Sequence, residues 1–284
     1  MELTSLKTIK SLATGFGFDF SKGLGQNFLL DNAVLDKIAQ AASGTDGVLE
    51  IGPGFGVLTQ VLSKNFKKVV SVEIDKSLLP ILDYTLSDCD NVKIVNADFM
   101  KLNLPELSAE DFSSKKISVA ANLPYYITTP IITELIEKRY DIDNIVVMVQ
   151  KEVAERFCAT PGTKEYGAIS VLCRYYTKPE IICKVPAGSF YPKPKVDSAG
   201  VRMKVCEKPN TMTTDEKLFF RVVKAAFAQR RKTLLNCLAN GLGMDKIKIE
   251  SVLKSVGIEP SVRGERLDIE EFASISNALS EMEL

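Results

Sequence analysis

The sequence predicts an α/β fold with a parallel, doubly wound sheet, because short apolar strands alternate with segments of helical spacing. A β-strand-like run at 47–52 ends in glycine, a helical pattern follows at 57–66, and a β-branched run follows at 68–75. The run at 144–149 is continuously apolar, which is typical of a strand buried on both faces. These observations place the first half of the chain in one layered α/β unit.

The remaining elements of this unit continue the alternation. We expect helices at 77–86 and 130–139 and strands at 91–98 and 116–121. After Gln150 the pattern changes to β-rich segments with short connections, which indicates antiparallel strands at the edge of the sheet. These segments are 169–176, 181–185 and 198–205.

The chain of 284 residues exceeds the usual size of one domain, so we expect a second, smaller one. The polar, turn-rich stretch 206–216 is the predicted boundary. Beyond it the spacing predicts helices, at 215–240, 245–256 and 268–284. The predicted domains are therefore 1–206, an α/β domain, and 207–284, a helical domain.

Composition excludes several classes of function. Lys and Arg number 36 and Asp and Glu number 36, so no uniformly basic surface for nucleic acid exists, although a local patch is possible. The absence of histidine excludes Ser-His-Asp and Cys-His catalysis and His-ligated metals. The six cysteines form no C-x-x-C pair, so we expect reduced thiols and no metal centre.

The chain also lacks the signals of targeting and assembly. It has no signal-peptide core near its start and no run of 18 apolar residues. No coiled-coil pattern is present. We therefore expect a cytoplasmic protein without a membrane span that acts as a monomer.

A glycine-rich turn joins the first strand to the first helix of the α/β unit. Gly52, Gly54 and Gly56 would let backbone approach a ligand beside the free N–H groups of a helix N-terminus. The third glycine of the dinucleotide fingerprint would fall at Val57, so the spacing argues against a cofactor bearing a pyrophosphate. The turn indicates a different nucleoside cofactor.

Two acids end the strands that follow this turn. Glu73 comes about 20 positions after Gly52, the spacing of a carboxylate that binds ribose hydroxyls. Asp98 ends the next strand and would lie at the same edge of the sheet, where it could accept a hydrogen bond from an adenine amine. A turn-forming role for Asp98 is almost as well supported by spacing alone.

The segment N-L-P-Y-Y follows the strand at 116–121 and suits chemistry on an aromatic amine. The lone pair of such an amine is delocalised into its ring, so two acceptors that hold its hydrogens would favour a reactive, pyramidal nitrogen. The side-chain oxygen of Asn122 and a backbone carbonyl beside Pro124 are the candidate acceptors. Tyr125 would stack on the face of the extruded base.

Two stretches carry local positive charge. Residues 217–232 hold six basic residues and no acid, and residues 178–204 hold six basic residues and two acids. Such runs are often only solvated faces, but near a reaction loop they suit RNA phosphates. We favour RNA contact for Arg230, Arg231 and Lys232.

Taken together, these motifs resemble the ribosomal RNA adenine dimethyltransferase family. The matching stretches occur in family order along nearly the whole chain, and their joint presence is highly specific. They are GQNFLLD at 25–31, EIGPGFGVLT at 50–59, VEID at 72–75, NAD at 96–98, NLPYYITTPI at 122–131, VQKEVAERF at 149–157, FYPKPKVDS at 190–198 and AFAQRRKTL at 226–234.

The resemblance implies a Rossmann-like methyltransferase that uses S-adenosylmethionine. It implies that the enzyme dimethylates N6 of two adjacent adenosines in the 3′-terminal hairpin loop of 16S rRNA, in the immature small ribosomal subunit. Cofactor contacts carry over to the following positions: Asn27, Leu29, Gly52, Gly54, Glu73, Asp98 and Asn122. Phe190 would stack on the other face of the target base or pack in the core, two roles that the sequence supports equally.

Alternatives remain open at this point. Within the same chemistry, the runner-up is a 23S rRNA dimethyltransferase of the macrolide-resistance type, which Pro130 and the segment 226–234 disfavour. A nicotinamide oxidoreductase is disfavoured by Val57 and the lack of histidine. A ribosome assembly factor without catalytic activity is disfavoured by the intact Asn122 loop.

Overall fold

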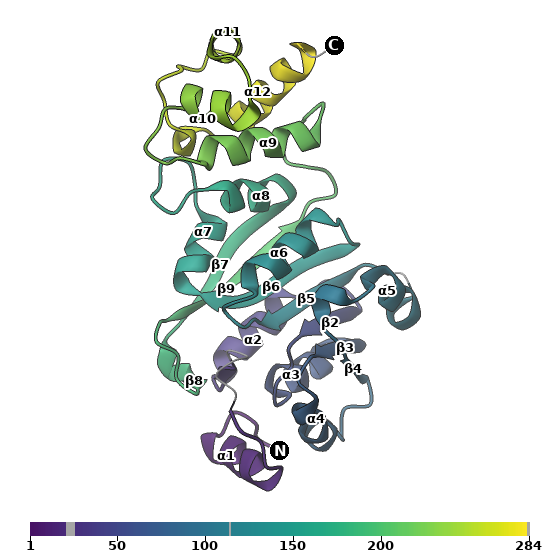
Figure 1. Cartoon of the computed structure of the whole chain (residues 1–284). Coiled ribbons are helices and arrows are strands. Elements are labelled where there is room, and N and C mark those ends of the chain that lie inside the picture. The colour runs from purple at the N-terminus through teal and green to yellow at the C-terminus, as the bar shows by residue number, and fades with distance from the viewer. Residues whose placement is uncertain (21–25, 114, 283–284) are drawn as a thin grey trace. The chain divides into compact units, whose positions relative to one another are not determined.

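The structure is a computed structural model that describes residues 1–20, 26–113 and 115–282. It contains a seven-stranded sheet with the order β4-β3-β2-β5-β6-β9-β7 (Figure 1). The strands are β2 (Gly47–Ile51), β3 (Lys68–Glu73), β4 (Val92–Asn96), β5 (Ile117–Asn122), β6 (Ile142–Gln150), β7 (Thr177–Val185) and β9 (Ser198–Val205). The predicted α/β fold is confirmed.

The first five strands of this order are parallel, and β9 runs antiparallel to β6. The predicted antiparallel strand at 198–205 is therefore confirmed as β9, and the segment 181–185 lies in β7 at the sheet edge. The central β6 is apolar because both its faces are covered, and residues 145–149 are fully buried. The order places the C-terminal ends of β2, β3, β4 and β5 along one edge, where ligands of such sheets bind.

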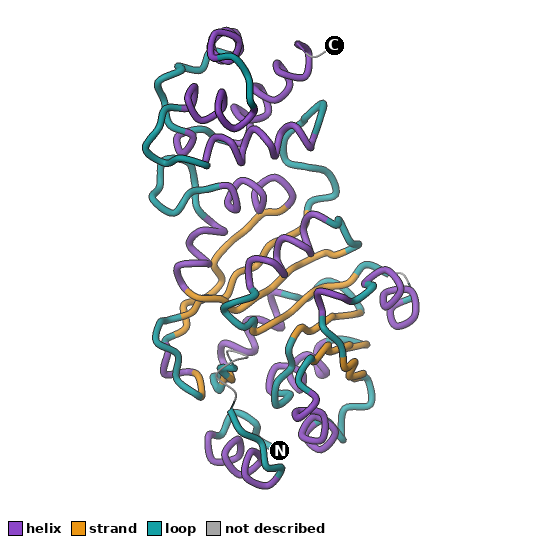
Figure 2. Tube along the Cα trace, in the orientation of Figure 1, coloured by secondary structure: helices purple, strands orange, loops and turns teal. Residues whose placement is uncertain are grey.

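Helices alternate with the parallel strands along the chain (Figure 2). They are α2 (Asn32–Ala41), α3 (Val57–Asn65), α4 (Leu79–Thr85), α5 (Leu104–Phe112) and α6 (Thr128–Glu137). Before them, α1 (Leu6–Gly15) starts the chain, and β1 (Phe28–Leu29) pairs antiparallel with β8 (Phe190–Tyr191). No helix in the described ranges is both long and apolar enough to cross a membrane.

The chain divides into two compact units, and the division differs from the predicted one. The first unit contains Met1–Ala154 and Pro179–Val205, and the second contains Glu155–Lys178 and Cys206–Leu284. Residues 155–178, which the sequence analysis assigned to the α/β domain, therefore belong with the C-terminal helices. The helices that start at or after residue 151 are α7 (Lys151–Cys158), α8 (Ala168–Tyr176), α9 (Glu216–Phe227), α10 (Leu234–Leu242), α11 (Lys246–Ser255) and α12 (Ile269–Met282).

The prediction of a strand at 169–176 is wrong, because this segment forms α8. Most of its side chains are buried, as they are in a core strand, and its β-branched and aromatic residues are typical of a strand. The Tyr175 ring stacks on Phe219 of α9, with ring centroids 4.7 Å apart. Tertiary packing thus overrides the local β preference.

The predicted helix 215–240 is two helices separated by a turn. The first, α9, ends at Phe227, and Thr233 precedes α10, accepting a hydrogen bond at 2.8 Å from the Asn236 side chain. A residue of this type at a helix start is a standard N-cap, but no glycine or proline announced the break. Arg230, Arg231 and Lys232 consequently lie in an exposed turn and not on a helix face.

Close packing of α9 against α10 makes a first prediction at Gly241. A Cβ atom there would lie 2.5 Å from the Cβ of Ala225 and 2.9 Å from its Cα, so Gly241→Ala should force the two helices apart. We expect a loss of about 1–3 kcal/mol in the free energy of unfolding, measured by urea denaturation. Gly15→Ala, in α1, is the control because its Cβ meets nothing within 4 Å. Equal stability of the two variants would contradict this account.

Candidate active site

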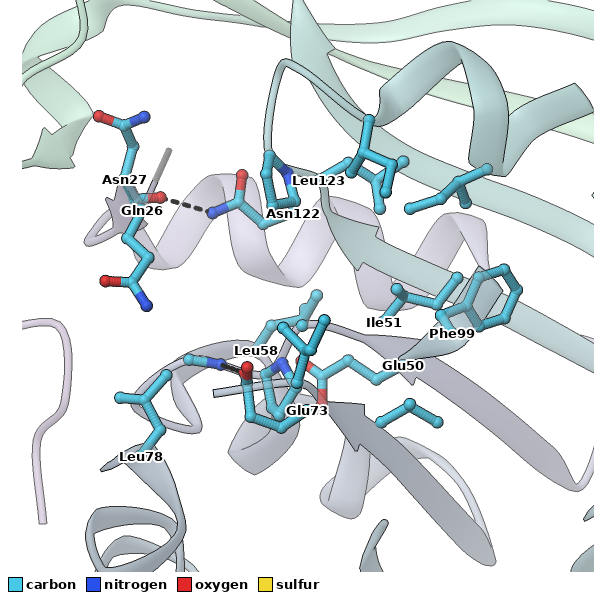
Figure 3. A pocket seen from close by; sticks show the side chains of 18 of the residues that line it. Gln26, Asn27, Glu50, Ile51, Leu58, Glu73, Leu78, Phe99, Asn122 and Leu123 are labelled. Carbon is cyan, nitrogen blue, oxygen red and sulfur yellow. Dashed lines mark hydrogen bonds between the residues drawn. The ribbon is translucent and has the colours of Figure 1, made fainter. Parts of the chain in front are cut away.

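A cavity opens at the edge of the sheet where the parallel strands end (Figure 3). Its walls come from the turns after β2, β3, β4 and β5 and from the N-terminal segment 26–29. Most of the predicted site residues meet here, although they are spread over some hundred positions. The predicted residues that line it are Asn27, Leu29, Gly52, Gly54, Glu73, Asp98, Asn122, Pro124 and Tyr125.

The glycine turn after β2 brings bare backbone to the cavity. Gly52 has φ +73° and Gly54 has φ +60°, a left-handed conformation that favours glycine. A Cβ on Gly52 would meet nothing within 4 Å, so the backbone there borders open space. A Cβ on Gly54 would lie 2.6 Å from the Phe28 ring, so this glycine also permits the N-terminal segment to close over the turn.

Glu73 is fixed at the end of β3 by two backbone donors. Its Oε2 accepts from the N–H of Gly54 at 3.3 Å and its Oε1 from the N–H of Asp75 at 2.8 Å. The side chain is buried, which raises the pKa of its carboxyl despite these bonds. The backbone N–H of Ile74 also stabilises the carboxylate. A carboxylate has about four acceptor positions, so one remains to receive a hydroxyl donor from a ligand in the cavity.

Asp98 follows β4 and combines two roles. Its Oδ1 accepts from the N–H of Met100 at 3.0 Å, and its Oδ2 lies 3.6 Å from the Lys101 ammonium. Asp98 is therefore a turn-forming residue, as one of the two sequence interpretations held. Asp98 also lines the cavity, so its role in the turn is compatible with a contact to a ligand there.

Sequence reasoning missed the environment of Glu50. This residue of β2 is 1% exposed, lines the cavity, and accepts hydrogen bonds from Ser71 at 2.6 Å and Thr59 at 2.7 Å. Burial raises the pKa of its carboxyl to about 7, although both hydrogen bonds act in the opposite direction. The sequence signal that could have indicated this buried acid is the position of Glu50 inside the apolar run 47–52.

The Asn122 amide at the end of β5 has a defined orientation. Its Nδ2 donates to the backbone carbonyl oxygen of Asn27 at 2.7 Å. Because a carbonyl oxygen only accepts, the atom that faces it must be the nitrogen. The Asn122 Oδ1 is therefore directed away from that contact as an acceptor, and Figure 3 shows the amide above Glu73, across the cavity.

The turn after Asn122 is held by its own backbone. The Pro124 carbonyl accepts from the N–H of Ile127 at 3.2 Å and from the Thr128 hydroxyl at 3.1 Å. The N–H of Leu123 donates to Met148 in β6 at 3.2 Å. Among the described residues, no donor engages the carbonyl of Leu123. Of the carbonyls beside Pro124, that of Leu123 is thus the one left to accept from a ligand.

Other predicted site residues lie elsewhere. Phe190 is 4% exposed in the hydrophobic core and is not among the described residues that line the cavity, so its position favours packing over base stacking. Arg230, Arg231 and Lys232 belong to the second unit. Gln26, which the sequence analysis did not select, lines the cavity and donates to Asp75 at 2.9 Å.

A family model described as ribosomal RNA adenine dimethylase matches residues 17–281. The chain belongs to the ribosomal RNA adenine dimethylase family. The match confirms the resemblance on which the predicted enzyme class and S-adenosylmethionine as cofactor depend.

Individual relatives of this dimethylase family member support the assignment. It is 51% identical to Ribosomal RNA small subunit methyltransferase A of Geobacillus thermodenitrificans and 50% identical to the protein of that name from Bacillus cytotoxicus. Both alignments cover 95% of this chain and 94% of the relative.

Two solved structures share the fold. A dimethyladenosine transferase from Plasmodium falciparum matches with a TM-score of 0.73 at 27% identity over 87% of this chain and 95% of its own. The 23S rRNA methyltransferase ErmE matches with a TM-score of 0.70 at 26% sequence identity. This match covers 89% of this chain and 99% of the ErmE chain. The predicted Rossmann-like methyltransferase fold is therefore confirmed.

Burial of Glu50 predicts a pH dependence of stability. The folded protein keeps this proton up to about pH 7, whereas an unfolded chain loses it near the ordinary value of 4.5. The associated stabilisation is complete below pH 4.5 and is lost as the pH rises through 7, with a total of about 3 kcal/mol. Glutamine cannot titrate, so the free energy of unfolding of Glu50→Gln should lack this decline between pH 4.5 and 8.

The control for this comparison is Glu110→Gln, at an exposed position of α5. Its unfolding free energy should follow the wild-type pH profile throughout. If Glu50→Gln runs parallel to wild type as well, Glu50 does not titrate in the folded state as described.

Proposed function

We propose that this protein dimethylates N6 of two adjacent adenosines in the 3′-terminal hairpin loop of 16S rRNA, during maturation of the small ribosomal subunit. Its relatives at about 50% identity carry the name Ribosomal RNA small subunit methyltransferase A. The observation on which the mechanism depends is the hydrogen bond that orients Asn122.

The residues around the cavity fit S-adenosylmethionine. The glycine turn leaves open space beside Gly52 for an amino-acid moiety, Glu73 retains an acceptor for a ribose hydroxyl, and Asp98 can accept from an adenine amine. The exposed apolar side chains of Ile74 and Met100 border the same space and suit a purine ring. When bound, the cofactor supplies an electrophilic methyl group on a sulfonium, so the protein needs no metal and no covalent intermediate.

The task of the protein is then to present the target nitrogen. In the first transfer, the Asn122 Oδ1 and the Leu123 carbonyl oxygen accept the two hydrogens of the adenine N6 amine. In the second transfer, one of these two acceptors holds the single hydrogen that the methylated amine retains. Holding both hydrogens draws the nitrogen toward a pyramidal form whose lone pair is directed into the cavity. Orientation of this kind contributes on the order of 7–11 kcal/mol to a reaction between two bound groups. The released proton passes to water, which agrees with a chain that lacks histidine.

Tyr125 stacks on the extruded adenine in this account. Its side chain lines the cavity next to Pro124, and stacking on an aromatic side chain accommodates a flipped base. Substrate selection therefore depends on the reaction loop and on RNA contacts outside the cavity.

The second unit supplies the RNA contacts. Arg231 and Lys232 are exposed in the turn between α9 and α10, whereas the Arg230 guanidinium donates to the carbonyl of Lys164. Cationic side chains in an exposed turn suit phosphate oxygens. In the first unit, Arg202 pairs with Glu180 and Lys204 with Asp143, so these two contribute less free charge than the sequence indicates. We place the activity in the cytoplasm, performed by a monomer on the immature subunit.

Mass spectrometry of rRNA tests the substrate directly. Small subunits that lack the two dimethyladenosines are incubated with the protein and S-adenosylmethionine, in parallel with protein-free 23S rRNA. We expect four methyl groups per 16S rRNA and none on 23S rRNA. Methylation of 23S rRNA alone would favour the activity named for ErmE. Binding to subunits without methyl transfer would indicate an assembly factor instead.

Removal of the Asn122 acceptor predicts a loss of catalysis. Asn122→Ala should lower kcat by about 100-fold or more, the usual cost of deleting one preorganised polar group at a reacting centre. The affinity for RNA, measured by filter binding, should remain close to wild type. Asn65→Ala removes an exposed asparagine of α3 and should keep full activity. Undiminished methyl transfer by Asn122→Ala would refute the role of this side chain.

Charge reversal in the turn between α9 and α10 predicts weaker RNA binding. Replacing Arg231 and Lys232 by glutamate should lower RNA affinity at least tenfold and reduce its salt dependence, because about two phosphate contacts are lost. Cofactor affinity, measured by calorimetry, should not change. The matched control reverses Lys246 and Lys248 of α11 in the same unit. An equal loss in both double variants would show that only net charge matters.

A further inference from the structure

A hydrogen bond links the reaction loop to the antiparallel part of the sheet. The Tyr125 hydroxyl lies 2.8 Å from the Ser198 hydroxyl, and either group can be the donor. The two residues are 73 positions apart in the chain. Tyr125 belongs to the turn after β5, and Ser198 is the first residue of β9.

Ser198 is itself held rigidly. It is 1% exposed and pairs in register with Gln150 at the end of β6. The preceding residue, Asp197, accepts from the N–H of Lys151 at 3.0 Å through its carbonyl and from the N–H of Ala187 at 2.9 Å through its carboxylate. The backbone of Ser198 is therefore tied to β6 on one side and to the loop before β8 on the other.

Tyr125 depends on this contact for the direction of its ring. Its backbone is fixed by the turn at Pro124, but its side chain is only half-buried. The phenol is protonated at neutral pH, and burial raises its pKa further, so the hydroxyl remains available as a donor or an acceptor. Without a partner at the end of the ring, the two side-chain torsions would have several accessible positions.

We propose that Ser198 is a positioning residue for methyl transfer, which holds the Tyr125 ring in the one orientation that stacks on the target base. This inference rests on the proposed function, because it concerns the base that the reaction loop receives. The strand β9 thereby contributes to the site although it is not among its parallel strands. A small displacement of a stacking ring misaligns the amine that Asn122 holds, and misalignment lowers the rate more than the affinity.

A double-mutant cycle tests the proposal. Ser198→Ala and Tyr125→Phe each delete one hydroxyl and retain an aromatic ring at position 125. Each should lower kcat for methylation of small subunits about three- to tenfold, the size of one neutral hydrogen bond, while KM for subunits and the calorimetric Kd for S-adenosylmethionine stay within twofold. The double variant should be no slower than either single variant, because all three lack the same bond.

Tyr140→Phe is the matched control. It deletes another tyrosine hydroxyl bond of the first unit, to Glu134 at 3.0 Å, outside the cavity lining, and should keep wild-type kcat. Melting temperatures of all variants separate a rate effect from unfolding. Losses that multiply in the double variant, or wild-type kcat in either single variant, would overturn the role of Ser198. Failure of the wild type itself to methylate subunits would instead reject the proposed function.

Discussion

The hydrogen bond between the Asn122 amide and the Asn27 carbonyl determines how the site is built. It joins the end of β5 to a segment 95 positions earlier in the chain. That segment is held in place by the pairing of β1 with β8 and by the bond from the N–H of Leu30 to Ser189. Since the carbonyl can only accept, the bond leaves the amide a single orientation and leaves Oδ1 as the acceptor that the proposed mechanism uses.

The two parts of the sheet contribute differently to this site. The ends of the parallel strands supply the glycine turn, Glu73 and Asp98, which surround the space for the cofactor. The loop after β5 carries the groups that we propose bind the target amine, and the first residue of β9, Ser198, is hydrogen-bonded to Tyr125 of that loop. In the proposed mechanism, cofactor and target thus meet where β5 ends, between groups that are already hydrogen-bonded to the scaffold.

The elements that the sequence predicted well are those with a clear local cause. The strands at 47–52, 68–75 and 116–121 were found because β-branched runs end at glycine or polar residues, and their shared edge then brought Gly52, Glu73 and Asn122 together. The helix α8 was misassigned because it is buried on nearly all sides, and the break before Thr233 was missed because it contains neither glycine nor proline.

The contacts that the sequence could not predict join distant segments. Nothing in the local pattern pairs Asn27 with Asn122 or Tyr125 with Ser198, because these bonds depend on strand order and register. The same holds for Glu50, whose pKa is raised by burial and only partly lowered by the hydroxyls that β3 and α3 supply. Motifs therefore indicated which residue types the chemistry needs, and the fold determined which atoms face each other.

A structure of the protein with S-adenosylhomocysteine and an RNA hairpin that carries the two adenosines would test the central claim most directly. The account predicts that one adenine is extruded, with its N6 within hydrogen-bond distance of both the Asn122 Oδ1 and the Leu123 carbonyl oxygen, while Asn122 Nδ2 still donates to Asn27. An adenine bound elsewhere, or an Asn122 amide that has rotated to give its nitrogen to the base, would contradict it.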